Sequence, residues 1–139
     1  MHPRRQAREM ILQALYAYDI TQEPETKIIN DIINRYSPEK DVVEFITRLF
    51  NTVIEKKEWT DSIISQFLEN WDFDRVARID RLILRLAICE LYFENDVPGK
   101  VSIAEAIEIA KHYSTEESSS FVNGILDSVY KQYKQKEEE

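Results

Sequence analysis

The scarcity of glycine and proline constrains this chain more than any other feature of its sequence. Only two glycines and four prolines occur in 139 residues. Apolar residues recur almost everywhere at helical spacing rather than at the alternating spacing of strands. The sequence therefore predicts an all-α fold of about seven helices with short connections, and no strand.

Three helices are expected in the first half of the chain. The first runs from about Pro3 to Ile20, with proline in the first turn, where its missing N–H is harmless. The second covers "ETKIINDIINRY". Ser37 is expected to be the N-cap of the third, with Pro38 as its first residue. The apolar face of this third helix carries Val42, Phe45, Ile46, Leu49, Phe50, Val53 and Ile54.

Four helices are expected in the second half, each with a predicted N-terminal signal. Thr60 caps the first of them, and Asp74 caps a mostly apolar helix over residues 75–93 that should be the central buried element. Ser102 and Glu105 have capping-box spacing and open the next helix. The segment "STEESSS" supplies the last cap, and "KQKEEE" is expected to fray as a solvated tail.

The two halves are predicted to be helical subdomains of a single domain. The division falls near Trp59, which gives subdomains of residues 1–59 and 60–139. A chain of this length can bury about two thirds of its unfolded surface, so a stable monomer needs no disulfides.

Charge and composition favour an intracellular protein without a metal site. The net charge is −8 and the isoelectric point is near 4.9, so nucleic acid can be bound only through a local basic patch. The single cysteine, Cys89, lies in an apolar run and is expected in the core. His2 and His112 lack a second ligand at i+3 or i+4. Neither a signal peptide nor a membrane span fits the sequence, so a cytoplasmic location is expected.

Motifs for catalysis and phosphate binding are missing from the sequence. It contains no GxSxG, GxxxxGK[ST], GxGxxG or HExxH. The carboxylate pairs Asp72 with Asp74 and Glu116 with Glu117 fall at expected helix starts, where they favour the helix dipole. We therefore expect no enzymatic activity and no cofactor.

Arg4, Arg5 and Arg8 gather at the start of the first helix, where the helix dipole repels each cation by roughly 0.3–1 kcal/mol. On a helical wheel, Tyr16 falls about 160° from the centre of the apolar face and about 20° from Arg5. Arginines beside an outward ring suit single-stranded RNA, because guanidinium groups hold phosphates while the ring stacks on a base. The alternative is that the arginines are ordinary surface charges and that Tyr16 packs on a neighbouring helix.

The segment "SSSFVNGILD" carries a second signal. Gly124 lies inside a helical pattern, where glycine costs about 1 kcal/mol relative to alanine, so something is expected to approach the backbone there. Packing of another helix is the simpler candidate. Phe121 falls at the edge of the apolar face, where it either stacks on a base or belongs to the periphery of the core.

A further arginine stripe, made of Arg78, Arg81 and Arg85, lies on the helix over residues 75–93. Arg85 is embedded among leucines and isoleucines. We expect it to form a structural ion pair with a partly buried carboxylate such as Glu105, rather than to bind RNA.

Four blocks of the sequence follow one another in the order "RRQAREMILQALYAYD", "RIDRLILRLAICEL", "VSIAEAIEIAKHYS" and "FVNGILD". Together they resemble the NusB family of bacterial transcription antitermination factors. The resemblance spans nearly the whole chain. It implies an all-α fold of two helical subdomains.

The resemblance also implies a function and partners. NusB-like proteins bind the single-stranded boxA element of nascent ribosomal RNA together with NusE, a small-subunit ribosomal protein. The complex joins RNA polymerase and helps it to read through terminators, without catalysis. The alternative is a purely protein-binding helical module, and the sequence does not decide between a monomer and a homodimer.

The resemblance assigns roles to individual positions. The arginine-rich start of the family falls on Arg4, Arg5 and Arg8, and Gln6 stands where some members have another arginine. Other RNA-contacting positions fall on Tyr16 and Phe121, with acidic positions near the RNA path on Asp74 and Glu117. The acid that faces NusE in the family falls on Asp80.

Overall fold

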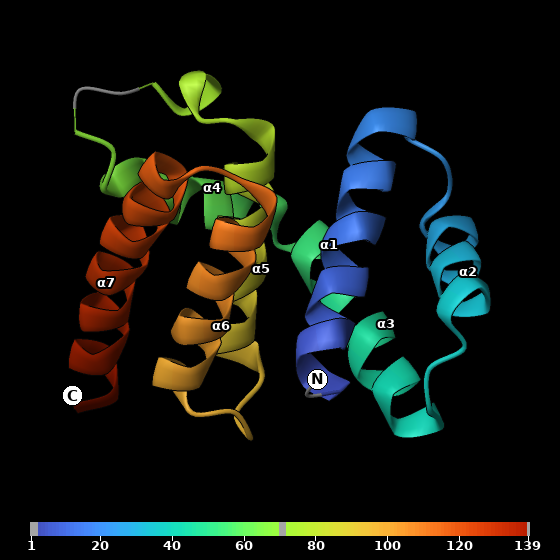
Figure 1. Cartoon of the computed structure of the whole chain (residues 1–139). Helices are drawn as coiled ribbons and strands as arrows, with labels where there is room; N and C mark the ends of the chain where they lie inside the picture. The colour runs from blue at the N-terminus through green and yellow to red at the C-terminus, as the bar shows by residue number, and fades with distance from the viewer. Residues whose placement is uncertain (1–2, 70–71, 139) are drawn as a thin grey trace. The chain divides into compact units, whose positions relative to one another are not determined.

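The computed structural model is all-α and describes residues 3–69 and 72–138 (Figure 1). In these residues there are seven α-helices, one short 3-10 helix and no strand, which confirms the predicted fold class. The helices are α1 (Pro3–Thr21), α2 (Glu25–Tyr36), α3 (Lys40–Glu55), α4 (Lys57–Gln66), η1 (Phe73–Arg75), α5 (Arg78–Phe93), α6 (Gly99–Tyr113) and α7 (Glu116–Glu138). No helix in the described part of the chain is long and apolar enough to cross a membrane.

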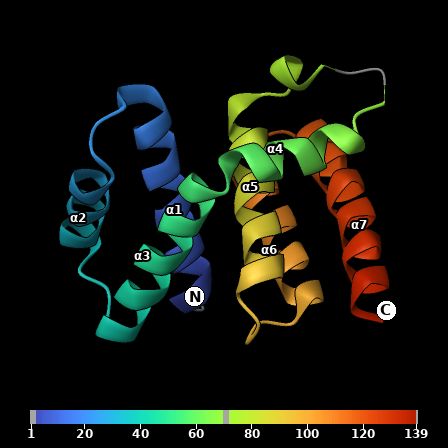
Figure 2. The same ribbon diagram turned by 180° about the vertical axis from the view of Figure 1, so that it is seen from behind.

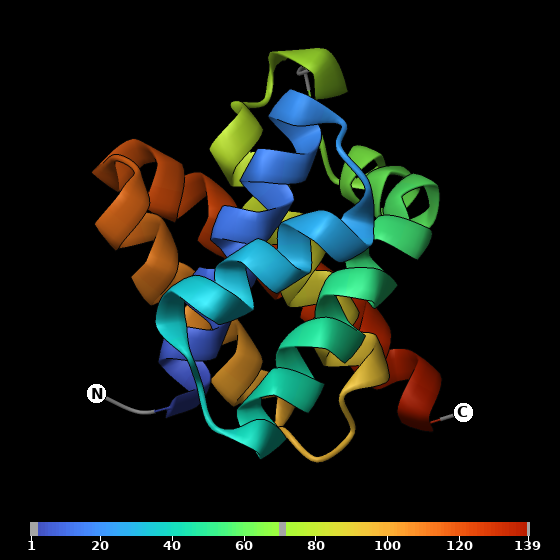
Figure 3. The same cartoon turned by 90° about the vertical axis from the view of Figure 1, so that its right-hand side faces the viewer.

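The chain divides into two compact units, Met1–Glu55 and Lys56–Glu139. In the first unit α1 contacts both α2 and α3, and Figure 3 shows α2 crossing α1. The face of α1 predicted to be apolar is buried, with Ile11 and Ala14 fully inaccessible. A hydrogen bond of 2.8 Å from Tyr36 Oη to Gln13 Oε1 joins α2 to α1. Apolar packing of α1 therefore organises the first unit.

In the second unit α5 contacts α4, α6 and α7. Every residue from Leu82 to Leu91 is buried, which confirms the prediction of a central buried helix. The chain turns back after α5 into α6 and again into α7, and α6 and α7 lie side by side (Figures 1 and 2). The Cys89 thiol is fully buried, and burial raises its pKa to about 12. Cys89 is thus a core residue, as predicted.

Two polar pairs are built into the core of the second unit. Arg85 Nε donates a hydrogen bond of 2.7 Å to Asp61 Oδ1, and Arg85 Nη2 donates one of 3.0 Å to Asp61 Oδ2. The predicted structural role of Arg85 is confirmed, but its observed partner is Asp61 of α4 and not Glu105. The hydroxyl of Ser102 donates a hydrogen bond of 2.6 Å to the buried carboxylate of Glu90.

The predicted N-caps Ser37 and Thr60 are both wrong. Ser37 ends α2 in the left-handed conformation (φ 45°, ψ 54°), and its N–H donates to Ile33 O at 2.8 Å. Helix α3 therefore begins later, at Lys40. Thr60 lies inside α4. Its hydroxyl donates hydrogen bonds to the carbonyl oxygens of Lys56 and Lys57, one turn back.

Two predicted N-caps of the second unit are also wrong, whereas the last is confirmed. Asp74 lies in η1, and α5 begins only after Ala77. Ser102 lies within α6, which begins earlier, after Pro98. The Thr115 hydroxyl accepts the N–H of Ser118 at 3.1 Å, which is the cap expected from "STEESSS". Helix α7 extends to Glu138 and so includes residues 134–138 of the expected tail.

Candidate nucleic-acid interface

The three arginines at the start of α1 have three different environments. The Arg4 guanidinium lies 4.1 Å from the centroid of the Phe45 ring on α3, a cation–π contact within the first unit. Arg5 is half-buried, whereas only 4% of Arg8 is exposed. Arg8, which the sequence placed with the other arginines beside an outward Tyr16, is buried and adds no accessible cation to that surface. Arg5 and Arg4 keep partial access to solvent.

Tyr16 lies on the exposed side of α1, as the helical wheel predicted. It is 47% exposed, one of the most exposed large hydrophobic side chains of the described chain. Tyr16 follows Arg5 by three turns of the same helix, a rise of about 16 Å. The first turn of α1 contains no acidic residue that would offset the repulsion between the helix dipole and its cations. This face of α1 can offer a cation and a ring to one extended ligand.

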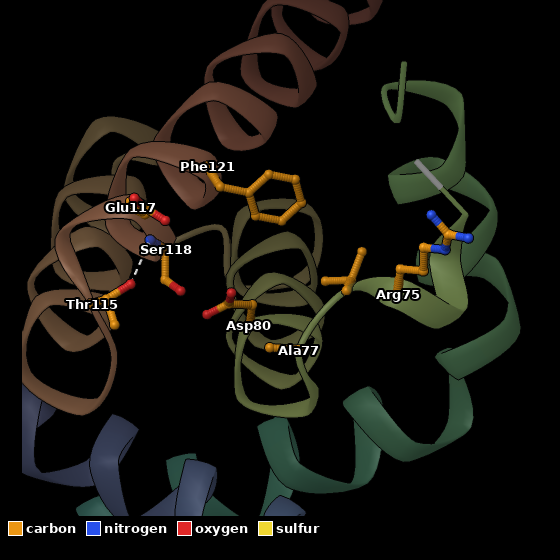
Figure 4. A pocket seen from close by; sticks show the side chains of 8 residues that line it. Arg75, Ala77, Asp80, Thr115, Glu117, Ser118 and Phe121 are labelled. Carbon is orange, nitrogen blue, oxygen red and sulfur yellow. Dashed lines mark hydrogen bonds between the residues drawn. The ribbon is translucent and has the colours of Figure 1, made fainter. Parts of the chain in front are cut away.

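A cavity of about 270 Å³ opens in the second unit where α5 begins and α6 turns into α7 (Figure 4). It brings together three of the predicted site residues, Asp80, Glu117 and Phe121, while Asp74 lies exposed on η1 outside it. The complete lining is Arg75, Val76, Ala77, Asp80, Thr115, Glu117, Ser118 and Phe121. The sequence did not predict Arg75 as a site residue. The only signal for it in the sequence is its position directly after Asp74.

Asp80 is the buried acid of this cavity. Only 4% of the residue is exposed, and burial raises the pKa of its carboxyl group, an effect that the hydroxyls of Ser118 and Ser114 partly oppose. Its Oδ1 atom is buried without a hydrogen-bond partner among the described residues. Asp80 therefore offers almost no surface to a partner in this structure, although the residue belongs to the lining of the cavity.

Phe121 separates this cavity from a second hollow of about 360 Å³, because its side chain lines both. The lining of the second hollow is Phe67, Leu68, Glu69, Ser120, Phe121, Gly124, Ile125 and Ser128. Phe121 is half-buried and belongs to neither a closed core nor a fully exposed surface.

Gly124 opens onto the second hollow without packing against another helix. A Cβ atom placed there would meet no atom within 4 Å. The simpler explanation for this glycine, close packing of another helix, therefore does not apply within the described chain. The space in front of the Gly124 backbone is open to a ligand.

Alanine at Gly124 is expected to stabilise the free protein by about 0.5–1 kcal/mol, because alanine favours a helix and its Cβ meets nothing. Thermal unfolding followed by circular dichroism checks this. Gly99→Ala is the matched control and should destabilise, because its Cβ would lie 2.8 Å from Leu91 Cδ1 and 2.9 Å from Tyr130 Cε1. Equal effects of the two substitutions would contradict the open environment of Gly124.

The remaining ionisable candidates within the described residues form no second site. His112 is exposed at the end of α6, and its ring packs edge-on against Tyr113. His2 lies outside the described residues. Within residues 3–69 and 72–138, no group of three or more histidine, cysteine, aspartate or glutamate side chains is arranged to hold a metal ion.

Comparison with known proteins gives matches over nearly the whole chain. The model of the NusB family matches residues 5–131. A transcription antitermination protein NusB from Chloroherpeton thalassium is 47% identical, and the match covers 96% of this chain and 64% of that protein. The protein of the same name from Dehalococcoides mccartyi is 43% identical, with 92% of this chain and 90% of that protein covered.

Solved structures match the fold equally well. NusB of T. maritima superposes with a TM-score of 0.87 at 40% identity, covering 94% of this chain and 92% of that one. A chain from a crystal structure of the antitermination factors NusB and NusE in complex with double-stranded RNA gives a TM-score of 0.86 at 29% identity, covering 96% of this chain and 99% of that one. The fold and these matches define a class of helical proteins whose named members are transcription antitermination factors. The chain belongs to the NusB family.

Proposed function

We propose that this protein is a transcription antitermination factor that binds the boxA element of nascent ribosomal RNA together with NusE. The observation that carries the proposal is the match, over 96% of this chain, to a solved complex of NusB and NusE with RNA. The protein would act by binding, without catalysis or a cofactor. It would work where transcription takes place, in the bacterial cytoplasm, as part of a complex that supports processive RNA polymerase.

In this proposal α1 and the cavity make separate contacts with the RNA. Arg5 neutralises a phosphate and Tyr16 stacks on a base, while Phe121 stacks on another base at the cavity. Stacking of this kind requires unpaired bases, so we propose a single-stranded target although the matched complex contains double-stranded RNA.

The other predicted residues have supporting roles in the proposal. Arg4 and Arg8 are held by packing and burial, so we propose that they shape the start of α1 and strengthen its positive potential. The exposed carboxylates of Asp74 and Glu117 would line the RNA path and repel phosphates from wrong positions. A NusE contact through Asp80 would have to reach into the cavity.

The experiment that tests this function is a titration of fluorescently labelled boxA RNA and a scrambled strand, each with and without purified NusE. We expect boxA to bind more tightly than the scrambled strand, and more tightly still when NusE is present. Equal binding of both strands under both conditions would contradict the proposal and leave a purely protein-binding module.

Replacement of Arg5 by alanine is expected to reduce the slope of log K against log salt concentration by about one, because one phosphate contact is lost. The measurement is the boxA titration repeated at several salt concentrations. Arg35→Ala, which removes an exposed arginine of α2 in the same unit, is the matched control and should leave the slope unchanged. An unchanged slope for Arg5→Ala would remove Arg5 from the RNA interface.

A further inference from the structure

Four aromatic side chains of the second unit pack together where α4 begins and where α5 and α7 approach their ends. We call them the aromatic patch, which consists of Trp59, Tyr92, Phe93 and Tyr133. The Trp59 ring lies edge-on to Tyr92 and to Phe93, with centroids 5.0 Å and 5.6 Å apart. Tyr92 lies edge-on to Tyr133 at 4.9 Å. The last turns of α5 and α7 point to the same end of this unit (Figures 1 and 2). Three helices therefore hold the four rings in one arrangement.

The aromatic patch is accessible to solvent. Phe93 is 42% exposed, and the other three rings are half-buried. Contiguous apolar surface marks interaction sites more often than single exposed rings do. Tryptophan and tyrosine supply much of the binding energy at protein interfaces. Rings that are already fixed by edge-on packing lose little conformational freedom when a partner binds. The patch therefore has the composition and the rigidity of an interaction surface.

Lysines without ion-pair partners border the aromatic patch. Lys56 Nζ lies 5.7 Å from the centroid of the Phe93 ring. Lys134 Nζ, on the other side of the patch, lies 5.9 Å from the centroid of Tyr130 on α7. Neither these two lysines nor the exposed Lys57 forms an ion pair with a described residue. Positive charge is therefore available beside the exposed rings.

This positive charge is local. The chain as a whole carries a net charge of −8. Other lysines of the same unit are neutralised, since Lys111 pairs with Glu108 at 3.5 Å and Lys131 pairs with Asp127 at 3.2 Å. Beside the patch, the exposed Glu58 offsets only one of the lysines. An anionic partner is repelled by most of this chain and attracted here, so charge complementarity selects both the partner and the place where it binds.

The packing of the rings favours an acidic protein segment over RNA. A base stacks on an open ring face, but the edge-on contacts turn ring edges against ring faces, and the Lys56 ammonium lies over the Phe93 ring. Apolar side chains need no such parallel face. Ring edges also carry partial positive charge, which adds to the attraction of the lysines for carboxylates.

We propose that the aromatic patch and its lysines are a docking surface for an acidic segment of another protein. Apolar side chains of that segment pack on Trp59 and Phe93, and its carboxylates pair with Lys56 and Lys134. No residue of the patch lines the cavity at the start of α7, so docking of the segment is expected to be independent of RNA binding.

Three labelled synthetic peptides test the docking surface, with binding to the full-length protein followed by fluorescence anisotropy at low salt. In the first peptide, phenylalanines are spaced by glutamates. The second has serine in place of each phenylalanine, and the third has lysine in place of each glutamate. We expect the first to bind about 10-fold more tightly than either of the others, because it alone combines apolar rings with carboxylates. Equal binding of the three peptides would overturn the proposal.

Phe93→Ala is expected to weaken binding of the first peptide about 10-fold, because truncation of an aromatic anchor removes much of the binding energy. Phe121→Ala, which removes an accessible ring at the cavity, is the matched control and should keep the peptide affinity. Lys56→Glu should also weaken binding, by a factor that shrinks at high salt. Its control is Lys111→Glu on α6, which should leave the affinity unchanged. Equal effects within either pair of variants would contradict the assignment.

Tryptophan emission shows whether the peptide reaches the patch in a protein that keeps all four rings. Trp71→Phe leaves Trp59 as the single tryptophan of the chain, and the peptides contain none. The first peptide should shift the Trp59 emission to shorter wavelength, because it displaces water from the ring. Binding without a change in emission would place the peptide elsewhere and overturn the proposal.

Two other occupants of the patch have their own outcomes. Displacement of the peptide by boxA RNA, or weaker boxA binding by Phe93→Ala, would make the patch an RNA surface and overturn the proposal. A dimer in analytical ultracentrifugation that Phe93→Ala dissociates would make it a contact between two copies of this chain. The boxA titration tests the proposed function separately, so failure of the peptides leaves that function standing.

Discussion

Replacing Asp61 by alanine is expected to lower the free energy of unfolding by about 3–5 kcal/mol, because it leaves a buried guanidinium without its counter-charge. The Arg85 side chain is 7% exposed and that of Asp61 is 22% exposed. Both Asp61 oxygens accept hydrogen bonds from the arginine, so the alanine variant loses two charge-assisted bonds at once. Urea denaturation followed by circular dichroism measures the loss.

Two further variants separate the cost of an unpaired charge from the worth of the ion pair. Glu23→Ala breaks the exposed pair with Lys27 and should change the unfolding free energy very little, because water screens this pair. Adding Arg85→Met to Asp61→Ala should recover much of the lost stability, because no buried charge remains. An Asp61→Ala variant no less stable than Glu23→Ala would show that Arg85 finds water or another partner.

Replacing Phe121 by alanine is expected to weaken RNA binding by roughly 10- to 100-fold, which corresponds to about 1–3 kcal/mol of stacking on one base. The half-buried ring lines two hollows, so its removal should change thermal stability little. The boxA titration gives the first quantity and thermal unfolding the second.

The control for Phe121 is another accessible ring in the same unit. Phe93→Ala removes a side chain that is 42% exposed at the end of α5, where it packs edge-on against Trp59. RNA binding should be unaffected by this change. A large loss of stability in Phe121→Ala would instead place that ring in the core, and unchanged RNA affinity would remove it from the interface.

Helix identity was predictable from periodicity, but helix starts were not. Helix α2 begins and ends where "ETKIINDIINRY" does. Its apolar periodicity and the residues that flank it, Pro24 and Ser37, indicate the same two ends. Thr60 and Ser102 look like caps in the sequence because hydroxyl residues favour that position. In the structure both hydroxyls act inside helices, one on carbonyls of its own helix and the other on the Glu90 carboxylate of a neighbouring helix. Periodicity carries no information about such distant partners.

The candidate site was predictable only in part, for the same reason. Exposure of Tyr16 followed from the wheel of a single helix, since it depends only on the direction opposite the apolar face. The burial of Arg8 and the partner of Arg85 depend on residues far away in the sequence. The cavity around Asp80 depends on how α5 meets the first turn of α7, a tertiary arrangement that no single segment encodes.

The Thr115 cap links this cavity to local unfolding of the first turn of α7. The first turn of α7 supplies Glu117 and Ser118 to the lining, and Thr115, the residue just before the helix, holds that turn by accepting the Ser118 N–H. Helix ends are the first parts of a fold to open, and a ligand that binds only the closed form lowers the population of the open one. Binding in the cavity and ordering of the start of α7 are therefore linked equilibria. A bound ligand should slow hydrogen exchange at the Ser118 amide, so this rate reports occupancy of the cavity without a label on the ligand.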